Sequence, residues 1–302
     1  MFNMRRIVLA IMACLISLTS FSQITVHNVP ESSRYRETIP PYDSTKNFLG
    51  LYKVKSYQGQ VFYVKGVSKE LQKYGYDNCY SIKKNNNASH YGVALGTYSN
   101  HSPYESLVGK YFYVRSVEDI NYTGNYWLSL ENRDRPGDVL WFYYQGQYKT
   151  AFPFIVVSHF DYLKRRYIGK EIAYFGRSTL KEFKVEFLKC NDIGIEDEHY
   201  NLSLFLDNDV ITNVENDREL YPGSGYFVLK EVYDRLVKQY GVDMVHLAMS
   251  RKISVGMAEE LLILAWGKPE DINRRSYSDE DQWVYGTQYV YVKKGIISAW
   301  SD

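Results

Sequence analysis

The stretch "GMAEELLILAWGKP", residues 256–269, decides the fold of the C-terminal part of the chain. Gly256 stands before a run of apolar residues and Gly267 stands directly after it, so both ends of a helix are marked. Pro269 prevents continuation because it lacks a backbone N–H and clashes with the preceding turn. Two glutamates in the first turn suit the positive end of the helix dipole. The pattern predicts a short helix with one apolar stripe.

The next stretch, "DQWVYGTQYVYVKKGIISAW", residues 281–300, predicts three antiparallel strands with turns at Gly286 and Gly295. The helix needs this sheet, because the apolar area of so short a helix does not outweigh the entropy lost on ordering it. Strict alternation predicts an aromatic face with Trp283, Tyr285, Tyr289 and Tyr291, and an aliphatic face with Val284, Val290 and Val292. If the aliphatic face covers the helices, the aromatic face is left for a partner. The candidate binding residues are therefore Trp283, Tyr285, Tyr289, Tyr291 and Trp300.

These two stretches together resemble the small envelope domain of the SmpA/OmlA (BamE-like) family, a two-helix, antiparallel-sheet unit that also occurs in β-lactamase-inhibitor-like proteins. The matching positions are Gly256 and Met257 at the start of the second helix, Gly267 and Pro269 at its end, and Trp283 and Tyr285 at the start of the sheet. The resemblance covers roughly the last fifth of the chain. It implies an outer-membrane or periplasmic module that binds protein partners or lipid and performs no chemistry.

Three segments further upstream look alike: "YQGQVFYVK" (57–65), "LVGKYFYVR" (107–115) and "YIGKEIAYF" (167–175). Each has a glycine followed by a strand, and the glycine permits a close turn into that strand. The simplest interpretation is three copies of one small β unit, and chance similarity is the alternative. Such units loosely resemble Src-homology-3-like barrels over about half of the chain. Bacterial barrels of this kind often bind peptidoglycan or peptides.

The predicted fold class is mainly β with an α+β C-terminal domain, in which small β-barrel-like repeats precede a helix-helix-antiparallel-sheet unit. The apolar spacing in "FVLKEVYDRLVKQYG" predicts an amphipathic helix from Leu229 to Tyr240. The predicted parts are an export signal (1–22), a linker (23–47), β unit 1 (48–104), β unit 2 (105–166), β unit 3 (167–226) and the BamE-like α+β domain (227–302).

The N-terminus carries Arg5 and Arg6, an apolar run to Leu18 and then small polar residues, which predicts an export signal cleaved after Ser22. The apolar run is too short to span a bilayer comfortably. Cys14 offers an alternative, a lipid anchor, but the sequence stays apolar after it, and soluble export is favoured. We expect a periplasmic or cell-surface protein of a Gram-negative-type bacterium, not transmembrane once processed.

Composition limits the partners. The chain has 36 basic and 35 acidic residues, a formal charge of +1, so no net field attracts nucleic acid. The 30 tyrosines reflect either β-propensity or an adhesive surface. Outside the export signal only Cys79 and Cys190 remain, as one disulfide or as two buried thiols.

No catalytic pattern is found: the histidines are scattered, and a zinc helix, a nucleophile elbow and a phosphate loop are all absent from the sequence. "IEDEHY" (195–200) is a cation site or, preferably, a solvated turn. The sequence predicts no enzyme, no cofactor and no metal. It favours an exported interaction module that docks an envelope protein. The alternative is a peptidoglycan- or glycan-binding protein that uses aromatic surfaces of the barrel-like units. An uncharacterised hydrolase is less favoured.

Overall fold

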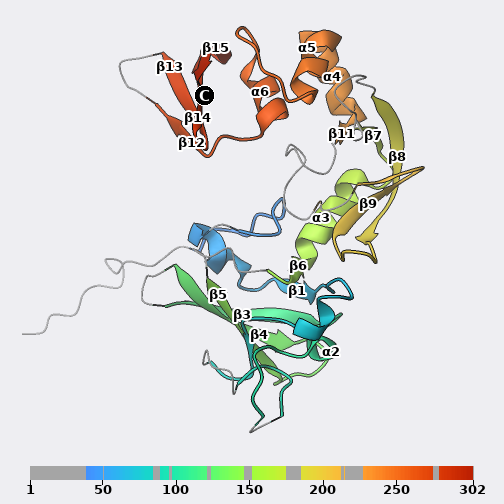
Figure 1. Ribbon diagram of the computed structural model, residues 1–302, viewed down its shortest axis with the longest axis vertical. Coiled ribbons are helices and arrows are strands. Elements are labelled where there is room, and N and C mark those ends of the chain that lie inside the picture. The colour runs from blue at the N-terminus through green and yellow to red at the C-terminus, as the bar shows by residue number, and fades with distance from the viewer. Residues whose placement is uncertain are drawn as a thin grey trace, which may run out of the picture. The chain divides into compact units, whose positions relative to one another are not determined.

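The computed structural model describes residues 39–49, 51–83, 89–94, 97–120, 124–145, 152–174, 185–211, 214, 227–274 and 279–301. The chain divides into a unit of residues Met1–Ile39 and a unit of residues Pro40–Asp302, and the fold below belongs to the second unit. The predicted export signal and most of the predicted linker lie outside the described residues. Figure 1 labels the helices and strands.

The first sheet has six strands in the order β2-β5-β4-β3-β1-β6, and all its pairings are antiparallel. Its strands are β1 (Val61–Val64), β2 (Cys79–Tyr80), β3 (Tyr111–Asp119), β4 (Asn125–Asn132), β5 (Val139–Gln145) and β6 (Phe154–Val156). Short helical turns η2 (Leu51–Tyr57), η3 (Gln72–Tyr74) and α2 (Tyr104–Leu107) precede or connect them. One face of the sheet carries a core rich in phenylalanine, which includes Phe62, Phe112, Phe142 and Phe154.

The three strand starts that look alike in the sequence share one local geometry. In each segment, the N–H of the residue after the glycine donates to the carbonyl of the residue two positions before the glycine. The three bonds run from Gln60 to Tyr57, from Lys110 to Leu107 and from Lys170 to Tyr167. The glycines have φ of 84°, 76° and 78° at positions 59, 109 and 169. Val108 and Ile168, each just before a glycine, are extended, as in a type II turn. A helix ends at each of these turns, and a strand follows it.

Each of these glycine turns also binds one residue of a neighbouring strand. The N–H of Gly59 donates to the carbonyl of Val114, while the N–H of Val114 donates to the carbonyl next to Gly59, on Gln60. The same reciprocal pair joins the Gly109 turn to Val64. These two reciprocal pairs of backbone hydrogen bonds join the first two copies. Strand β1 also pairs with β3, so that Phe62 lies opposite Phe112. β units 1 and 2 contribute neighbouring strands to one sheet.

The second sheet has the order β10-β9-β8-β7-β11. Its strands are β7 (Glu171–Tyr174), β8 (Glu186–Ile195), β9 (Leu202–Leu206), β10 (Val210–Ile211) and β11 (Phe227–Leu229), and α3 (Val157–Tyr167) leads into it. The helix predicted from Leu229 begins one residue later, as α4 (Lys230–Tyr240). Phe227–Leu229 is instead a buried strand that pairs with β7, so the first residues of the predicted C-terminal domain complete the sheet before it.

The C-terminal part combines helices with a third antiparallel sheet. Its elements are α5 (Val242–Met249), α6 (Glu259–Trp266), β12 (Asp271–Asn273), β13 (Glu280–Tyr285), β14 (Gln288–Lys293) and β15 (Ile296–Ser301), with the strands in that order. The predicted short helix is confirmed as α6, and Gly267 follows it with a φ of 85°. The predicted fold class, mainly β with an α+β C-terminal domain, is confirmed.

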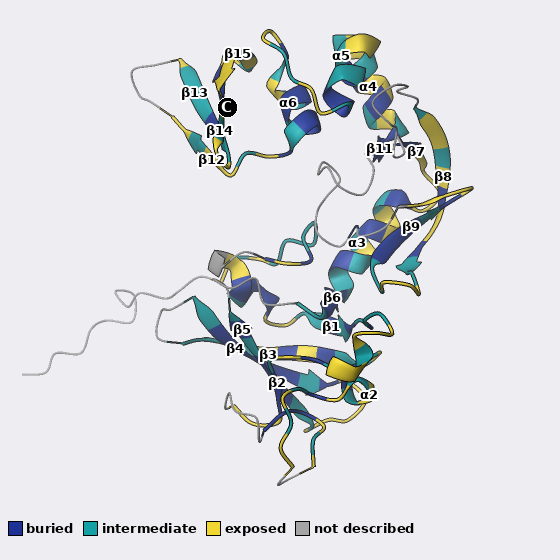
Figure 2. Ribbon diagram, viewed as in Figure 1, coloured by how far each residue is buried: buried dark blue, intermediate teal, exposed yellow. Residues whose placement is uncertain are grey.

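Burial follows these layers. Leu261, Leu264 and Ala265 of α6 pack with Trp283 and Ile297 of the third sheet in one core. Figure 2 shows this inner side of α6 as buried and the outer strand β15 as largely exposed. Among the described helices, none combines the length and the apolar character that crossing a membrane requires.

Candidate functional site

The predicted division of the C-terminal sheet into an aromatic and an aliphatic face is wrong. Trp283 pairs with Val290, and directly paired residues lie on the same face of a sheet. The reason is the loop between β13 and β14, which has only two residues because Tyr285 pairs with Gln288. Odd positions of one strand therefore lie beside even positions of the next. Each face mixes aromatic with aliphatic side chains.

Two of the five predicted binding residues have structural contacts. Trp283 is 6% exposed and belongs to the core between the helices and the sheet. The hydroxyl of Tyr285 donates to the carbonyl of Gly267 at 3.0 Å, and its ring packs edge-on against Trp266 with centroids 5.5 Å apart. Burial raises the pKa of Tyr285 well above its ordinary value. These two side chains help to hold α6 on the sheet.

The other three predicted residues are accessible. Tyr289 is 37% exposed and pairs with Val284 on the face turned away from the helices. Tyr291 is half-buried, and its hydroxyl accepts a hydrogen bond from the Gln282 side chain at 3.1 Å. Trp300 is 42% exposed and lies opposite Val290 in the edge strand β15. Because Val290 faces the helices, Trp300 lies at the edge of the helix-facing side, whereas Tyr289 and Tyr291 share the outward face. The structure therefore leaves a smaller outward aromatic surface than the sequence predicts, formed by Tyr289 and Tyr291.

A larger aromatic surface, missed by the sequence analysis, lies on the first sheet. The strand registers place seven aromatic side chains on the face turned away from the phenylalanine core: Tyr63, Tyr80, Tyr111, Tyr113, Trp127, Trp141 and Tyr143. We call this set the outer aromatic face; Tyr80 and Trp127 within it are buried, and the other five are half-buried or exposed. The guanidinium of Arg133 lies 3.9 Å from the centroid of the Tyr111 ring, and that of Arg115 lies 5.3 Å from the Tyr113 ring. The sequence signal that could have revealed this face is the tyrosine at every second position of "KYFYVR", residues 110–115.

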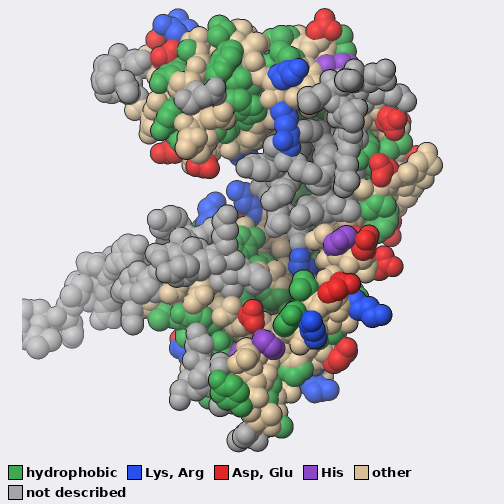
Figure 3. All heavy atoms as spheres, in the orientation of Figure 1, with side chains coloured by type: hydrophobic (Ala, Val, Ile, Leu, Met, Phe, Trp, Pro, Cys, Tyr) green, Lys and Arg blue, Asp and Glu red, His purple; other side chains and the backbone are tan. Residues whose placement is uncertain are grey.

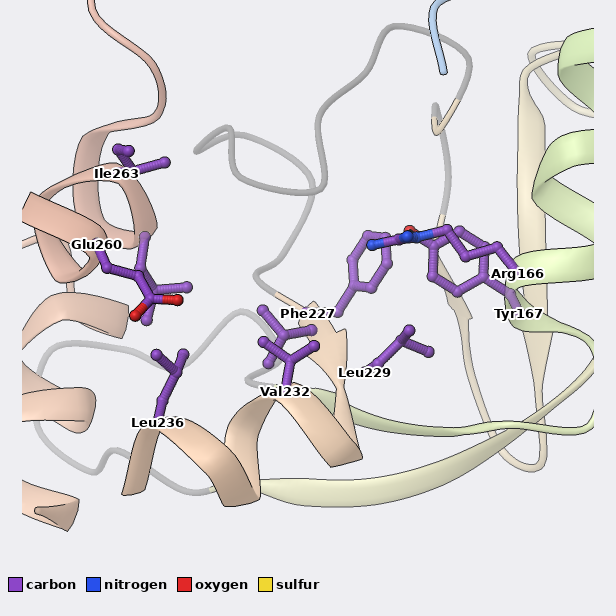
Figure 4. Close-up of a pocket in the computed structure, with 10 residues that line it drawn as sticks. Arg166, Tyr167, Phe227, Leu229, Val232, Leu236, Glu260 and Ile263 are labelled. Carbon is purple, nitrogen blue, oxygen red and sulfur yellow. The ribbon is translucent and has the colours of Figure 1, made fainter. Parts of the chain in front are cut away.

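A cavity of about 310 Å³ lies where the end of α3, the edge strand β11, α4 and α6 meet. Its walls are mainly apolar, and Figure 4 shows their side chains converging on it. The lining residues are Arg166, Tyr167, Phe227, Val228, Leu229, Val232, Leu236, Glu260, Ile263 and Leu264. Sequence periodicity alone does not reveal the cavity, since four separate elements build it.

Two charged side chains face this cavity from different walls, Arg166 from α3 and Glu260 from α6 (Figure 4). Glu260 accepts hydrogen bonds from both terminal nitrogens of Arg235 at 3.2 and 2.6 Å, and from the Tyr240 hydroxyl at 3.1 Å. The bond to Arg235 holds the pKa of Glu260 below its ordinary value. The Nε of Arg166 donates to the Tyr167 hydroxyl at 3.2 Å. The cavity therefore has a cation on one wall and a neutralised carboxylate on another.

Groups suited to metal binding do not come together in the described parts of the chain. No three histidine, cysteine or acidic side chains there form a group that could hold a metal ion. Cys79 and Cys190 are both buried and are not joined by a disulfide, and burial raises the pKa of each thiol. Within "IEDEHY", Glu196 accepts backbone N–H bonds from Glu198 and His199, as expected of a closed turn.

In comparisons with known proteins, no family model, curated protein or solved structure matches the chain. The resemblances to BamE-like and Src-homology-3-like domains stay predictions. The candidate sites therefore rest on geometry: the Tyr289 and Tyr291 surface, the outer aromatic face and the apolar cavity.

Proposed function

We propose that the protein is an exported, non-catalytic binding protein whose C-terminal domain docks a partner protein of the cell envelope. The observation that carries the proposal is the exposure of Tyr289, with the half-buried Tyr291 beside it, on a sheet face whose other side packs on helices. Tyrosine and tryptophan are enriched in protein interfaces because their rings bury a large area and their polar atoms still reach a partner. The export part rests on the sequence of residues 1–22.

Charge supports a protein partner over a nucleic acid. Figure 3 shows basic and acidic side chains interspersed on the face that it displays, without a continuous basic stripe. Several surface arginines and lysines sit beside carboxylates, as in the pairs Arg115–Glu131, Lys83–Glu118 and Arg235–Glu260. Interspersed charges are poorly suited to phosphate contacts, which dominate nucleic-acid affinity.

Site-specific photocrosslinking in cells tests the docking surface. A photoreactive amino acid replaces Tyr289 or Tyr291 in turn, and Tyr98, 73% exposed on another part of the chain, provides the control position. We expect one discrete adduct from positions 289 and 291 and none from position 98. The adduct from position 289 should weaken when Tyr291→Ser is added. Equal adducts from all three positions would show nonspecific contact and refute the proposal.

A second candidate function, glycan binding, is favoured by the outer aromatic face. Tyr113 is 37% exposed, while Trp141 and Tyr143 are half-buried, so ring edges and faces reach the surface. Aromatic rings with neighbouring arginine and glutamate suit stacking on sugar rings and hydrogen bonds to their hydroxyls. Co-sedimentation with purified peptidoglycan tests this candidate, with Tyr113→Ala against Tyr98→Ala as a matched pair of exposed tyrosines. Protein that stays in the supernatant would eliminate it.

A further inference from the structure

We propose that residues 42–46 form a pH-sensitive latch, which lies closed on α3 near neutral pH and lifts from it in acid when His159 takes up a proton. We call these residues the latch segment. They belong to the predicted linker (23–47), yet the structure holds them against the first sheet and α3. The proposal goes beyond partner docking and glycan binding and depends on neither.

The contact between the latch segment and α3 fixes one tautomer of a buried histidine. Nδ1 of His159 lies 2.8 Å from the carbonyl oxygen of Ser44. A carbonyl oxygen only accepts, so Nδ1 carries the hydrogen and donates it, and Nε2 of the neutral ring is a bare acceptor. The His159 side chain is fully buried, and its Nε2 has no hydrogen-bond partner. The closed latch therefore requires a neutral His159.

A proton on Nε2 is unfavourable while the latch is closed. It would place a charge and a second N–H donor in a buried site that offers that nitrogen no acceptor. Burial accordingly lowers the pKa of His159 below its ordinary value. The bond to Ser44 and the negative charge of Asp43 oppose this shift, but burial outweighs both.

The other groups around the ring do not replace His159 as the titrating group. Asp43 is the charged side chain of the latch segment that acts on the ring, and a bond from the Thr45 hydroxyl lowers its pKa, so it stays ionised while a histidine titrates. On α3 itself, the Tyr162 ring stacks on His159 with centroids 6.4 Å apart. The helix also packs on β1, β6 and β8, and no charged side chain in the described part of these strands acts on His159.

Asn47 marks the point from which the chain stays fixed. Its side chain donates to the carbonyl of Phe154 at 2.9 Å and accepts the N–H of Val156 at 2.8 Å, as a neighbouring strand would. The Tyr57 hydroxyl donates to the Asn47 carbonyl at 2.8 Å and accepts the N–H of Leu49 at 2.7 Å. Amide and phenol groups do not titrate between pH 5 and pH 8. Acid therefore acts on the latch segment and not on its anchor at Asn47.

Two features keep the latch segment closed and compact while His159 is neutral. The Tyr42 ring packs on the phenylalanine-rich core, with its centroid 6.0 Å from that of Tyr57. Within the segment, the Tyr42 hydroxyl donates to the Lys46 carbonyl at 2.8 Å, and Asp43 accepts the N–H of Thr45 at 3.1 Å. The segment can thus move as one piece about Asn47.

The size of the response follows from proton linkage. In the open form His159 reaches water and regains its ordinary pKa of about 6.5. The closed form is fully stable above that pH and loses stability as the pH falls below it, because the proton binds the open form more tightly. For one proton, the ratio of open to closed latch rises about tenfold between pH 7.5 and pH 5.5.

The test is hydrogen exchange of the full chain at pH 7.5 and pH 5.5, with protection expressed relative to unstructured peptide at the same pH. Peptides that contain residues 42–46 report the latch segment, and peptides that contain residues 154–156 report its anchor. His159→Asn keeps a donor near the position of Nδ1 but takes up no proton. His199→Asn removes a histidine with a 63% exposed side chain and is the matched control. Circular dichroism and thermal melting check that each variant folds.

We expect the protection of residues 42–46 to fall by up to about tenfold at pH 5.5 in the wild type and in His199→Asn, while residues 154–156 keep theirs. His159→Asn should show no such fall. NMR of wild-type His159 should give a pKa below about 6.5, a measurement that needs no variant. The latch is overturned if wild-type protection ignores pH, if His159→Asn responds as the wild type does, if His199→Asn abolishes the response, if residues 154–156 lose protection together with the latch segment, or if His159 titrates at its ordinary pKa or above.

Discussion

Replacing the glycine of a repeated turn by alanine tests whether the Gly59 and Gly109 turns hold the first two copies of the segment together. At Gly59 and Gly109 a Cβ atom would meet nothing within 4 Å, so only the backbone conformation opposes the substitution. An L-residue with positive φ costs about 1–2 kcal/mol. Alanine also lowers the conformational entropy of the unfolded chain, which stabilises the folded protein by about 0.4–1 kcal/mol. The net loss of unfolding free energy should therefore be about 1 kcal/mol for Gly59→Ala and the same for Gly109→Ala.

Gly75 provides the contrast. Its φ of 59° is also positive, but a Cβ there would overlap the carbonyl oxygen of Ser102. That oxygen accepts the N–H of Tyr76 at 2.9 Å, and moving it would break the bond. Losing a buried hydrogen bond adds about 1–3 kcal/mol, so Gly75→Ala should cost about 2–4 kcal/mol in total. The three alanine variants are compared with the wild type by urea unfolding. The midpoint of the transition and the dependence of the unfolding free energy on urea concentration are fitted separately.

Three results would refute this reasoning. An unchanged or raised midpoint in Gly109→Ala would mean that the turn does not need a positive φ. A large difference between Gly59→Ala and Gly109→Ala would mean that the two turns are not equivalent. A Gly75→Ala variant no less stable than Gly109→Ala would mean that the overlap with Ser102 is absent.

Three further outcomes are expected. Tyr57→Phe should lower the unfolding free energy by about 2–4 kcal/mol in urea, because the buried hydroxyl bonds two backbone groups of the preceding segment. Cys79 and Cys190 should resist alkylation at neutral pH until the protein unfolds, because both thiols are buried and burial raises the pKa of each. The lowered pKa of Glu260 means that its stabilising effect is present above the usual carboxyl pKa of 4.5 and is lost as the pH falls through the lower folded value. Stability measured from pH 7 to pH 3 should therefore fall less in Arg235→Gln than in the wild type.

Local sequence signals predicted the elements of the C-terminal part well. Gly267 ends α6 because a residue with positive φ stops the helix, and Pro269 prevents its return. The strands β13 and β14 are separated by a glycine-containing turn of minimal length. Each of these features depends on residues only a few positions apart, so a single sequence contains the information.

Features that depend on pairing between distant segments could not be predicted in the same way. The faces of β13 and β14 follow from the register, and a one-residue change in the loop would exchange them. Phe227–Leu229 has the apolar spacing of the following helix, yet these residues form β11 because β7 offers an unpaired edge. The cavity needs β11 in that place together with α3 and α6, so it follows from the same distant pairing.

The outer aromatic face connects the repeat in the sequence with a surface in the structure. Each copy of the segment places an outward-facing tyrosine four residues after its glycine, at position 63 or 113. Because the two copies pair antiparallel, Tyr63 comes to lie opposite Tyr111, with ring centroids 5.0 Å apart, and Tyr113 follows on the same face. The turns that join the two copies and stabilise the sheet therefore also bring these tyrosines together on one face. A variant that loosens the Gly59 or Gly109 turn should weaken any binding at this face in proportion to its loss of stability, whereas Tyr113→Ala should weaken binding alone.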